Sequence, residues 1–208
     1  MTRAASRIAP GELAALVGSR LCHDLVSPLG AIGNGVELLQ MAGDFPGIAK
    51  SPEMQLIEES VRAARTRIQI FRMAFGAAST DQRVSAPELA RLLEDMSQLG
   101  RLKIALESGD DLPRDEARMI LLGAMCFESA MPWGGRVMVL RAGPRWRLVA
   151  EGDRMKPDPS LWSLLDGAGD QPLPAASEVQ FALLAEYAAA AGRPVAWELD
   201  EKGGEISF

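Results

Sequence analysis

The residues with the clearest chemical potential lie in the stretch RLCHDLVSPLGAIGNGVELL, residues 20–39. His23, the only histidine of the chain, is followed directly by Asp24, and Arg20 lies one helical turn earlier. A carboxylate that holds one ring nitrogen of an imidazole fixes its tautomer and leaves the other nitrogen free as a nucleophile. A guanidinium one turn away can neutralise an arriving anion such as a phosphoryl group. The spacing therefore predicts a nucleophilic histidine that receives an anionic group.

A helix expected over residues 8–40 places His23 on its water-facing side. Apolar residues recur there at steps of three or four, the period of an amphipathic helix, at Leu13, Val17, Leu21, Leu25, Leu29, Ile32, Val36 and Leu39. At about 100° per residue, His23 lies roughly 160° from the centre of this stripe at Leu25. Small and polar residues share its face and predict a shallow docking platform for another protein: Ser19, Ser27, Gly30 and Asn34.

Pro28 lies inside this expected helix, just after the histidine. Proline has no amide hydrogen, so the carbonyl of Asp24 loses its helical hydrogen bond and the helix should bend there. Each residue of the stretch also has an ordinary interpretation, such as a solvated carboxylate for Asp24 or a plain surface position for His23. The combination at this spacing favours the functional interpretation.

A second helix is expected after the GDFPG run at 43–47, because glycine and proline end the first one. Ser51 is typical of an N-cap and Pro52 of the first helical position. A seam of the coiled-coil type follows, at Met54, Ile57, Val61, Ala64, Ile68, Phe71 and Phe75. Two helices bury little apolar surface alone, so we expect this hairpin to form a four-helix bundle in a homodimer.

The pattern changes after about residue 80 and predicts a second unit that mixes helices and antiparallel strands. Helices are expected from the capping box at Ser85 through Leu99, over 115–130, and from a second box, Ser177-x-x-Gln180, to Ala191. Strands are expected over 103–106, 137–141, 146–151, 195–199 and 205–208. The fold class is therefore α+β, with a helical hairpin at 1–80 and an α/β sandwich at 81–208.

Composition limits the classes of function. The net charge of -6 and the pI near 5.0 argue against broad nucleic-acid binding, which needs a basic face. Cys22 and Cys126 are too few and too far apart for a disulfide framework or a zinc site. No stretch approaches the ~20 apolar residues of a membrane span, and the first residues lack the apolar run of a signal peptide. We expect a soluble, cytoplasmic protein that binds no metal, membrane or nucleic acid.

The stretch His-Asp-x-x-Ser-Pro-Leu at 23–29 resembles the phosphoacceptor box of histidine kinase dimerisation domains, and the segment at 179–208 resembles the closing helix and hairpin of the kinase ATP-binding domain. The nucleotide motifs differ. Met125 and Ser129 stand where the kinases carry two asparagines, EGDRMKPDP stands for Asp-x-Gly-x-Gly, and GAGDQPLPAAS lacks a phosphate-cradling Gly-x-Gly. The resemblance therefore implies a domain that keeps the kinase fold without binding ATP.

A kinase-like dimer with an intact histidine, with Arg20-Leu-Cys-His-Asp24 and Ser27-Pro28 in place, resembles the ChpT-type histidine phosphotransferases of alphaproteobacteria. The resemblance implies that His23 accepts a phosphoryl group from the receiver domain of a hybrid kinase and passes it to the receiver of a downstream regulator. It implies that Asp24 orients the ring, Arg20 steadies the phosphoryl charge and Ser27 shapes the docking face. It implies no cofactor on this chain and Mg²⁺ on the partner receiver.

Three other functions remain open from the sequence. They are a divergent histidine kinase, a non-catalytic module that docks on a receiver, and a phosphatase in which Ser27 positions water. A basic run on the second helix is either a solvated face or a surface for acidic receivers: Arg62, Arg65, Arg67 and Arg72. We expect the tryptophans to anchor the core of the second unit: Trp133, Trp146, Trp162 and Trp197.

Overall fold

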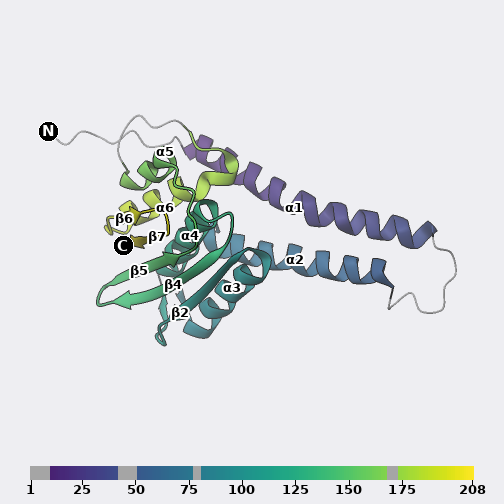
Figure 1. Ribbon diagram of the computed structural model, residues 1–208, viewed down its shortest axis with the longest axis horizontal. Helices are drawn as coiled ribbons and strands as arrows, with labels where there is room; N and C mark the ends of the chain where they lie inside the picture. The colour runs from purple at the N-terminus through teal and green to yellow at the C-terminus, as the bar shows by residue number, and fades with distance from the viewer. Residues whose placement is uncertain (1–9, 42–50, 77–80, 168–172) are drawn as a thin grey trace.

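The computed structural model describes residues 10–41, 51–76, 81–167 and 173–208, and Figure 1 shows a long helical hairpin projecting from a C-terminal α/β unit. The hairpin consists of α1 (Pro10–Met41) and α2 (Pro52–Ala74). The Ser51 hydroxyl accepts a hydrogen bond from the Met54 amide at 3.2 Å, which confirms the predicted N-cap. The predicted GDFPG break lies outside the described residues.

The C-terminal unit contains four helices and seven strands within the described residues. The helices are α3 (Ala86–Leu99), α4 (Arg114–Ala130), α5 (Pro159–Trp162) and α6 (Val179–Ala190), with 3₁₀ turns at η2 (Ser163–Asp166) and η3 (Ala176–Glu178). The strands are β1 (Arg83–Val84), β2 (Leu102–Glu107), β3 (Leu112–Pro113), β4 (Gly135–Ala142), β5 (Arg145–Glu151), β6 (Ala196–Leu199) and β7 (Gly203–Ser207). The predicted longer elements are confirmed, whereas the short β1–β3 pair and α5 were not predicted.

The main sheet has the strand order β2-β4-β5-β7-β6, and its strands are not all antiparallel. Strand β2 pairs with β4 in parallel, from Leu102↔Gly135 to Glu107↔Leu140. The purely antiparallel arrangement expected from the sequence is wrong at this edge, because α4 lies between the two strands as the crossover that a parallel pair requires. Helix α3 packs against β2, and α4 packs against β4 and β5. The result is a two-layer unit with one solvated sheet face.

The base of the hairpin belongs to the core of the C-terminal unit. Phe71 and Ala74, near the end of α2, are buried in the same cluster as the α4 side chains. Two arginines of α4 bond the end of α2 and the residues just after it: the Arg114 Nη2 donates to the Arg72 carbonyl at 2.8 Å, and Arg118 donates to the Gly76 carbonyl. The Arg72 carbonyl also accepts from the Gly76 amide at 3.2 Å, so Arg114 is a second donor to it. Both arginines tie the end of α2 to α4. The domain boundary predicted at residue 80 falls beside residues 77–80, which the structure does not describe.

Two local predictions for the C-terminal unit are wrong. Trp133 is 56% exposed, with Arg154 stacked 4.5 Å above its ring, whereas Trp146 and Trp162 are core residues as expected. Helix α6 does not begin at a Ser177–Gln180 capping box. The 3₁₀ turn η3 precedes it, and there the Glu178 carboxylate accepts from the amide of Ala175 at 3.2 Å. The Gln180 side chain is therefore not used for capping and can contact other parts of the molecule.

Candidate functional site

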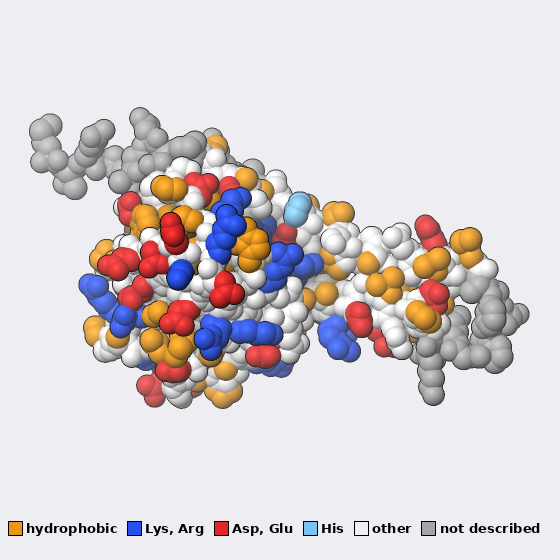
Figure 2. Space-filling model, in the orientation of Figure 1, with side chains coloured by type: hydrophobic (Ala, Val, Ile, Leu, Met, Phe, Trp, Pro, Cys, Tyr) orange, Lys and Arg blue, Asp and Glu red, His pale blue; other side chains and the backbone are white. Residues whose placement is uncertain are grey.

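His23 lies on the surface of α1, close to where the hairpin leaves the C-terminal unit. Its side chain is 79% exposed, which confirms the predicted solvent-facing position. Figure 2 shows this one histidine, in pale blue, at the junction of the two parts of the molecule. The residues expected to share its face are also exposed: Ser19, Ser27, Gly30 and Asn34. A second macromolecule can therefore reach the ring without any rearrangement of the fold.

Asp24 holds the ring of His23 from the adjacent position. The distance from His23 Nδ1 to Asp24 Oδ1 is 2.8 Å. An ionised carboxylate only accepts hydrogen bonds, so Nδ1 must carry the proton. In the neutral ring, Nε2 then keeps its lone pair. This geometry makes Nε2 the nucleophilic atom.

Arg20 is turned toward the C-terminal unit, which differs from its expected place on the open docking face. Its Nε donates to Asp24 Oδ2 at 2.5 Å, as the four-residue spacing on a helix allows, and its side chain is only 15% exposed. Its Nη1 donates to the main-chain carbonyl of Ser177 and lies 3.5 Å from Oε1 of Gln180. The side chain is held in this position because η3 and α6 pack against α1.

The carbonyl that Pro28 deprives of a helical partner receives a hydrogen bond from the second helix of the hairpin. The Arg67 Nη1 donates to the Asp24 main-chain oxygen at 3.3 Å. The orphaned carbonyl is predictable from Pro28, whereas Arg67 was expected in a basic run on the surface of the second helix. The contact was invisible in the sequence because it joins residues 43 positions apart. Arg67 therefore links α2 to the turn of α1 that carries the histidine.

A cavity of about 190 Å³ lies directly behind this turn, between the hairpin and the C-terminal unit. Its charged lining residues are Arg20, Asp24, Arg67 and Glu128. Although part of Glu128 is exposed, withdrawal from water raises the pKa of its carboxyl. Arg20 and Arg67 lower that pKa, and Asp24 raises it. The two arginines thus face two carboxylates in one compact group beneath His23.

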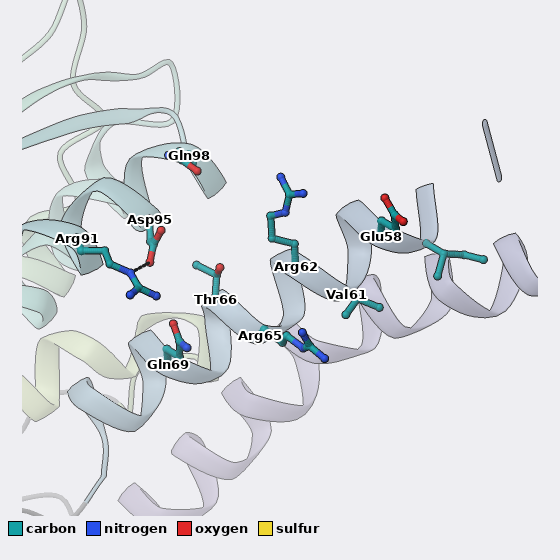
Figure 3. Close-up of a pocket in the computed structure, with 10 residues that line it drawn as sticks. Glu58, Val61, Arg62, Arg65, Thr66, Gln69, Arg91, Asp95 and Gln98 are labelled. Atoms are coloured by element: carbon teal, nitrogen blue, oxygen red, sulfur yellow. Dashed lines mark ion pairs between the residues drawn. The ribbon is translucent and has the colours of Figure 1, made fainter. Parts of the chain in front are cut away.

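Another part of the basic run lines a cleft of about 550 Å³ between α2 and α3, shown in Figure 3. Arg62 and Arg65 line it from α2, and Arg91 lines it from α3 (Figure 3). Arg91 is 3.9 Å from Asp95, whereas Arg62 and Arg65 make no ion pair within the described parts of the chain. The cleft therefore offers positive charge within about one and a half turns of α2 from Arg67.

The two positions where the resemblance expects asparagines serve packing and hydrogen bonding instead. Met125 is 4% exposed and lines the cavity behind the histidine. The Ser129 hydroxyl donates to the Met125 carbonyl at 3.4 Å and accepts from Gln180 Nε2 at 2.9 Å. Within the described residues no group of His, Cys, Asp and Glu side chains has the arrangement of a metal site, and no helix could cross a membrane.

Comparison with known proteins places this architecture in a family. The model of the histidine phosphotransferase C-terminal domain matches residues 86–203. The chain is 32% identical over 186 residues to the protein phosphotransferase ChpT of Brucella abortus (strain 2308), covering 85% of this chain and 87% of that protein. A solved structure of a bacterial phosphotransferase superposes with a TM-score of 0.79 at 28% identity, covering 96% of this chain and 97% of the other. The chain therefore belongs to the ChpT-type histidine phosphotransferase family.

Proposed function

We propose that this protein relays phosphoryl groups between the receiver domains of two-component signalling proteins through a phosphohistidine at His23. The observation that carries the proposal is an exposed imidazole whose Nδ1 is held by Asp24, which leaves Nε2 free to attack. Family membership supports the same assignment. His23, Asp24 and Ser27 keep the roles expected from the sequence. Arg20 does not, because it is turned toward the C-terminal unit and acts through Asp24.

The transfer step requires little chemistry from the protein beyond positioning and charge. The Nε2 lone pair of His23 attacks the phosphorus of the receiver's aspartyl phosphate, an N–P bond forms, and the P–O bond to the receiver carboxylate breaks. The proton stays on Nδ1, where Asp24 balances the positive charge that develops on the ring. The reverse step onto a second receiver uses the same geometry. Mg²⁺ is expected on the receiver, and this chain is expected to need no ATP.

The partners follow from the two surfaces that the hairpin leaves open. We propose that the face around His23, with Ser19, Gly30 and Asn34, docks the receiver. The cleft with Arg62 and Arg65 contributes positive charge nearby, which speeds encounter with an acidic partner. The apolar side chains farther along the hairpin fit a second copy of this chain, so the working unit is a homodimer. A relay between response regulators would act in the cytoplasm, which is where we expect the protein.

A phosphotransfer assay tests the function directly. Purified protein is mixed with a receiver domain that carries ³²P-phosphoaspartate, and a parallel reaction contains [γ-³²P]ATP alone. We expect acid-labile label to appear on the protein only with the receiver, and His23→Ala to abolish it. His23→Ala should keep the thermal stability of the parent protein, because its side chain is 79% exposed. Label retained by His23→Ala would contradict the assignment of His23 as the phosphorylated residue.

The same assay separates the alternatives. Label taken directly from ATP would identify a divergent kinase. Loss of phosphate from the receiver without labelling of this protein would identify a phosphatase, and unchanged receiver phosphate would identify a docking module. A thermal shift with ATP adds an independent measurement, because a nucleotide with a Kd of ~10 μM, present at ~1 mM, would stabilise the protein by about 2.7 kcal/mol. We expect no shift.

A further inference from the structure

Two positions of the C-terminal unit accept from Arg20 on the turn of α1 that carries His23: the main-chain carbonyl of Ser177 and the side chain of Gln180, at the start of α6. Gln180 is 1% exposed, so both ends of its amide need partners inside the protein. Its Nε2 donates to the Ser129 hydroxyl at 2.9 Å, which orients the amide so that Oε1 faces Arg20 at 3.5 Å. A guanidinium can only donate, so this orientation matches the two partners.

From Gln180 a continuous chain of hydrogen bonds reaches the histidine. Arg20 is fixed at its Nη1 end by the Ser177 carbonyl and the Gln180 amide, and its Nε donates to Asp24 Oδ2. The other oxygen of the same carboxylate holds His23 Nδ1. Each link constrains the rotamer of the next side chain, because a carboxylate with both oxygens engaged cannot rotate freely.

We propose that Gln180 is a positioning residue that sets the tautomer and orientation of His23 through Arg20 and Asp24. The C-terminal unit then contributes to phosphotransfer by holding the nucleophile. Ser129, which stands at a position where the kinase resemblance expects a nucleotide-binding asparagine, anchors the first link. The effect on transfer rate rests on the proposed function, whereas the effect on the ring does not.

The single histidine of this chain makes the ring directly measurable. Long-range ¹H–¹⁵N NMR spectra of the ¹⁵N-labelled full-length protein, recorded where the ring is neutral, show which nitrogen carries the proton. We expect the Nδ1–H tautomer to dominate in the wild type and the Nε2–H tautomer to gain population in Gln180→Ala. Gln180→Glu retains an acceptor for Arg20, and the Ser129 hydroxyl can donate to its other carboxylate oxygen, so this variant should keep the wild-type tautomer. The transfer rate should fall by about tenfold in Gln180→Ala, the size of one lost hydrogen bond to a charged group.

The matched control is Gln82→Ala. Gln82 also accepts a hydrogen bond from an arginine, Arg114 Nη1 at 3.2 Å, but it does so beside the other end of α4. We expect wild-type tautomer and rate for this control. Tryptophan fluorescence verifies that each variant is folded. If Gln180→Ala does not fold, Arg20→Gln breaks the same chain from the hairpin side and must shift the tautomer in the same direction.

A wild-type ring spectrum in folded Gln180→Ala, or in Arg20→Gln, would overturn the proposal. An equal loss of rate in Gln180→Ala and Gln180→Glu, without any change in the ring, would do the same. The failure of the relay itself is a different result: label on His23→Ala would remove the proposed function while leaving the tautomer measurement intact.

Discussion

The hairpin and the C-terminal unit differ in how far each has buried its own apolar side chains. The C-terminal unit encloses a continuous core in which Leu89, Leu112 and Ile120 have no exposed surface. Most of the large apolar side chains that remain exposed in the described residues lie on the hairpin: Val26, Leu29, Val36, Leu38, Met41, Leu56 and Ile68. Figure 2 shows such side chains, in orange, along the projecting part. The C-terminal unit covers its own apolar side chains, whereas the hairpin leaves a row of them exposed, which fits the proposed association with a second chain.

The candidate site lies at the boundary between these two regions. His23 belongs to the hairpin. Arg20, one turn earlier on α1, hydrogen-bonds to Ser177 and Gln180 of the C-terminal unit and so ties this turn to it. A mobile helix would present the ring in many orientations. A helix anchored on a closed core presents it in one, which favours in-line attack.

The largest expected difference between the two regions is in the free energy of unfolding. Leu122→Ala removes a side chain with no exposed surface and should destabilise the C-terminal unit by about 3 kcal/mol. Leu38→Ala, at 48% exposed, should change that value by less than about 0.5 kcal/mol. Urea unfolding followed by tryptophan fluorescence measures this directly, because all four tryptophans lie between residues 133 and 197. Equal effects of the two variants would contradict the comparison.

The second effect concerns association. The double variant Leu29→Glu with Ile68→Glu places charges on the exposed apolar face of the hairpin, where the side chains are 59% and 50% exposed. We expect the dimer Kd to rise by about 100-fold, or about 2.7 kcal/mol. Light scattering after size-exclusion chromatography gives the mass. Met138→Glu, on the solvated face of the sheet at 39% exposure, is the control and should leave the dimer intact. A dimer that survives the double variant would place the interface elsewhere.

A smaller effect tests the link between α2 and the turn of α1 that carries His23. Arg67→Met should cost about 1 kcal/mol, because it leaves the Asp24 carbonyl without its donor. In a Pro28→Ala background the cost should fall to less than half, since the restored amide hydrogen supplies a helical partner. A double-mutant cycle on thermal unfolding measures this coupling. Arg65→Met, from the cleft, is the control and should be additive with Pro28→Ala; additivity for Arg67 as well would refute the link.

The last difference between the two regions is in the reactivity of their cysteine thiols and involves no change in stability. Cys22 is exposed on α1, whereas Cys126 is buried in α4, and burial raises the pKa of the Cys126 thiol well above its usual value. Iodoacetamide should therefore modify Cys22 in the native protein and leave Cys126 unmodified. Mass spectrometry locates the label, and both cysteines should react in urea. Native modification of both at similar rates would show that α4 opens readily.

Much of the fold was predictable because its signals are local. The caps at Ser51 and Ser85, and the left-handed Gly192 that follows α6, mark helix ends through the sequence around them. The exposure of His23 followed from helical period alone. The predicted docking positions around it are exposed, but their role remains a prediction.

The contacts that hold the site were not predictable, because they join residues distant in the sequence. Arg20 contacts Gln180, which is 160 positions away in the sequence. The helical period does not indicate that the Arg20 side chain turns toward the C-terminal unit. The parallel pairing of β2 with β4 depends on where α4 crosses, which the strand signals do not specify. The exposure of Trp133 was not predicted, because a tryptophan is usually largely buried. Here the guanidinium of Arg154 stacks on the indole ring and covers part of it.

The anchoring of α2 by arginines of α4 has a consequence for synthesis on the ribosome. The Gly76 carbonyl bonds to Arg118, which is synthesised 42 residues later. At about 5–20 residues per second, this interval is roughly 2–8 s. During that time the nascent hairpin lacks its hydrogen bond to Arg118. Its apolar stripe is then exposed to chaperones and to neighbouring chains on the same polysome before Arg118 has bonded the end of the hairpin.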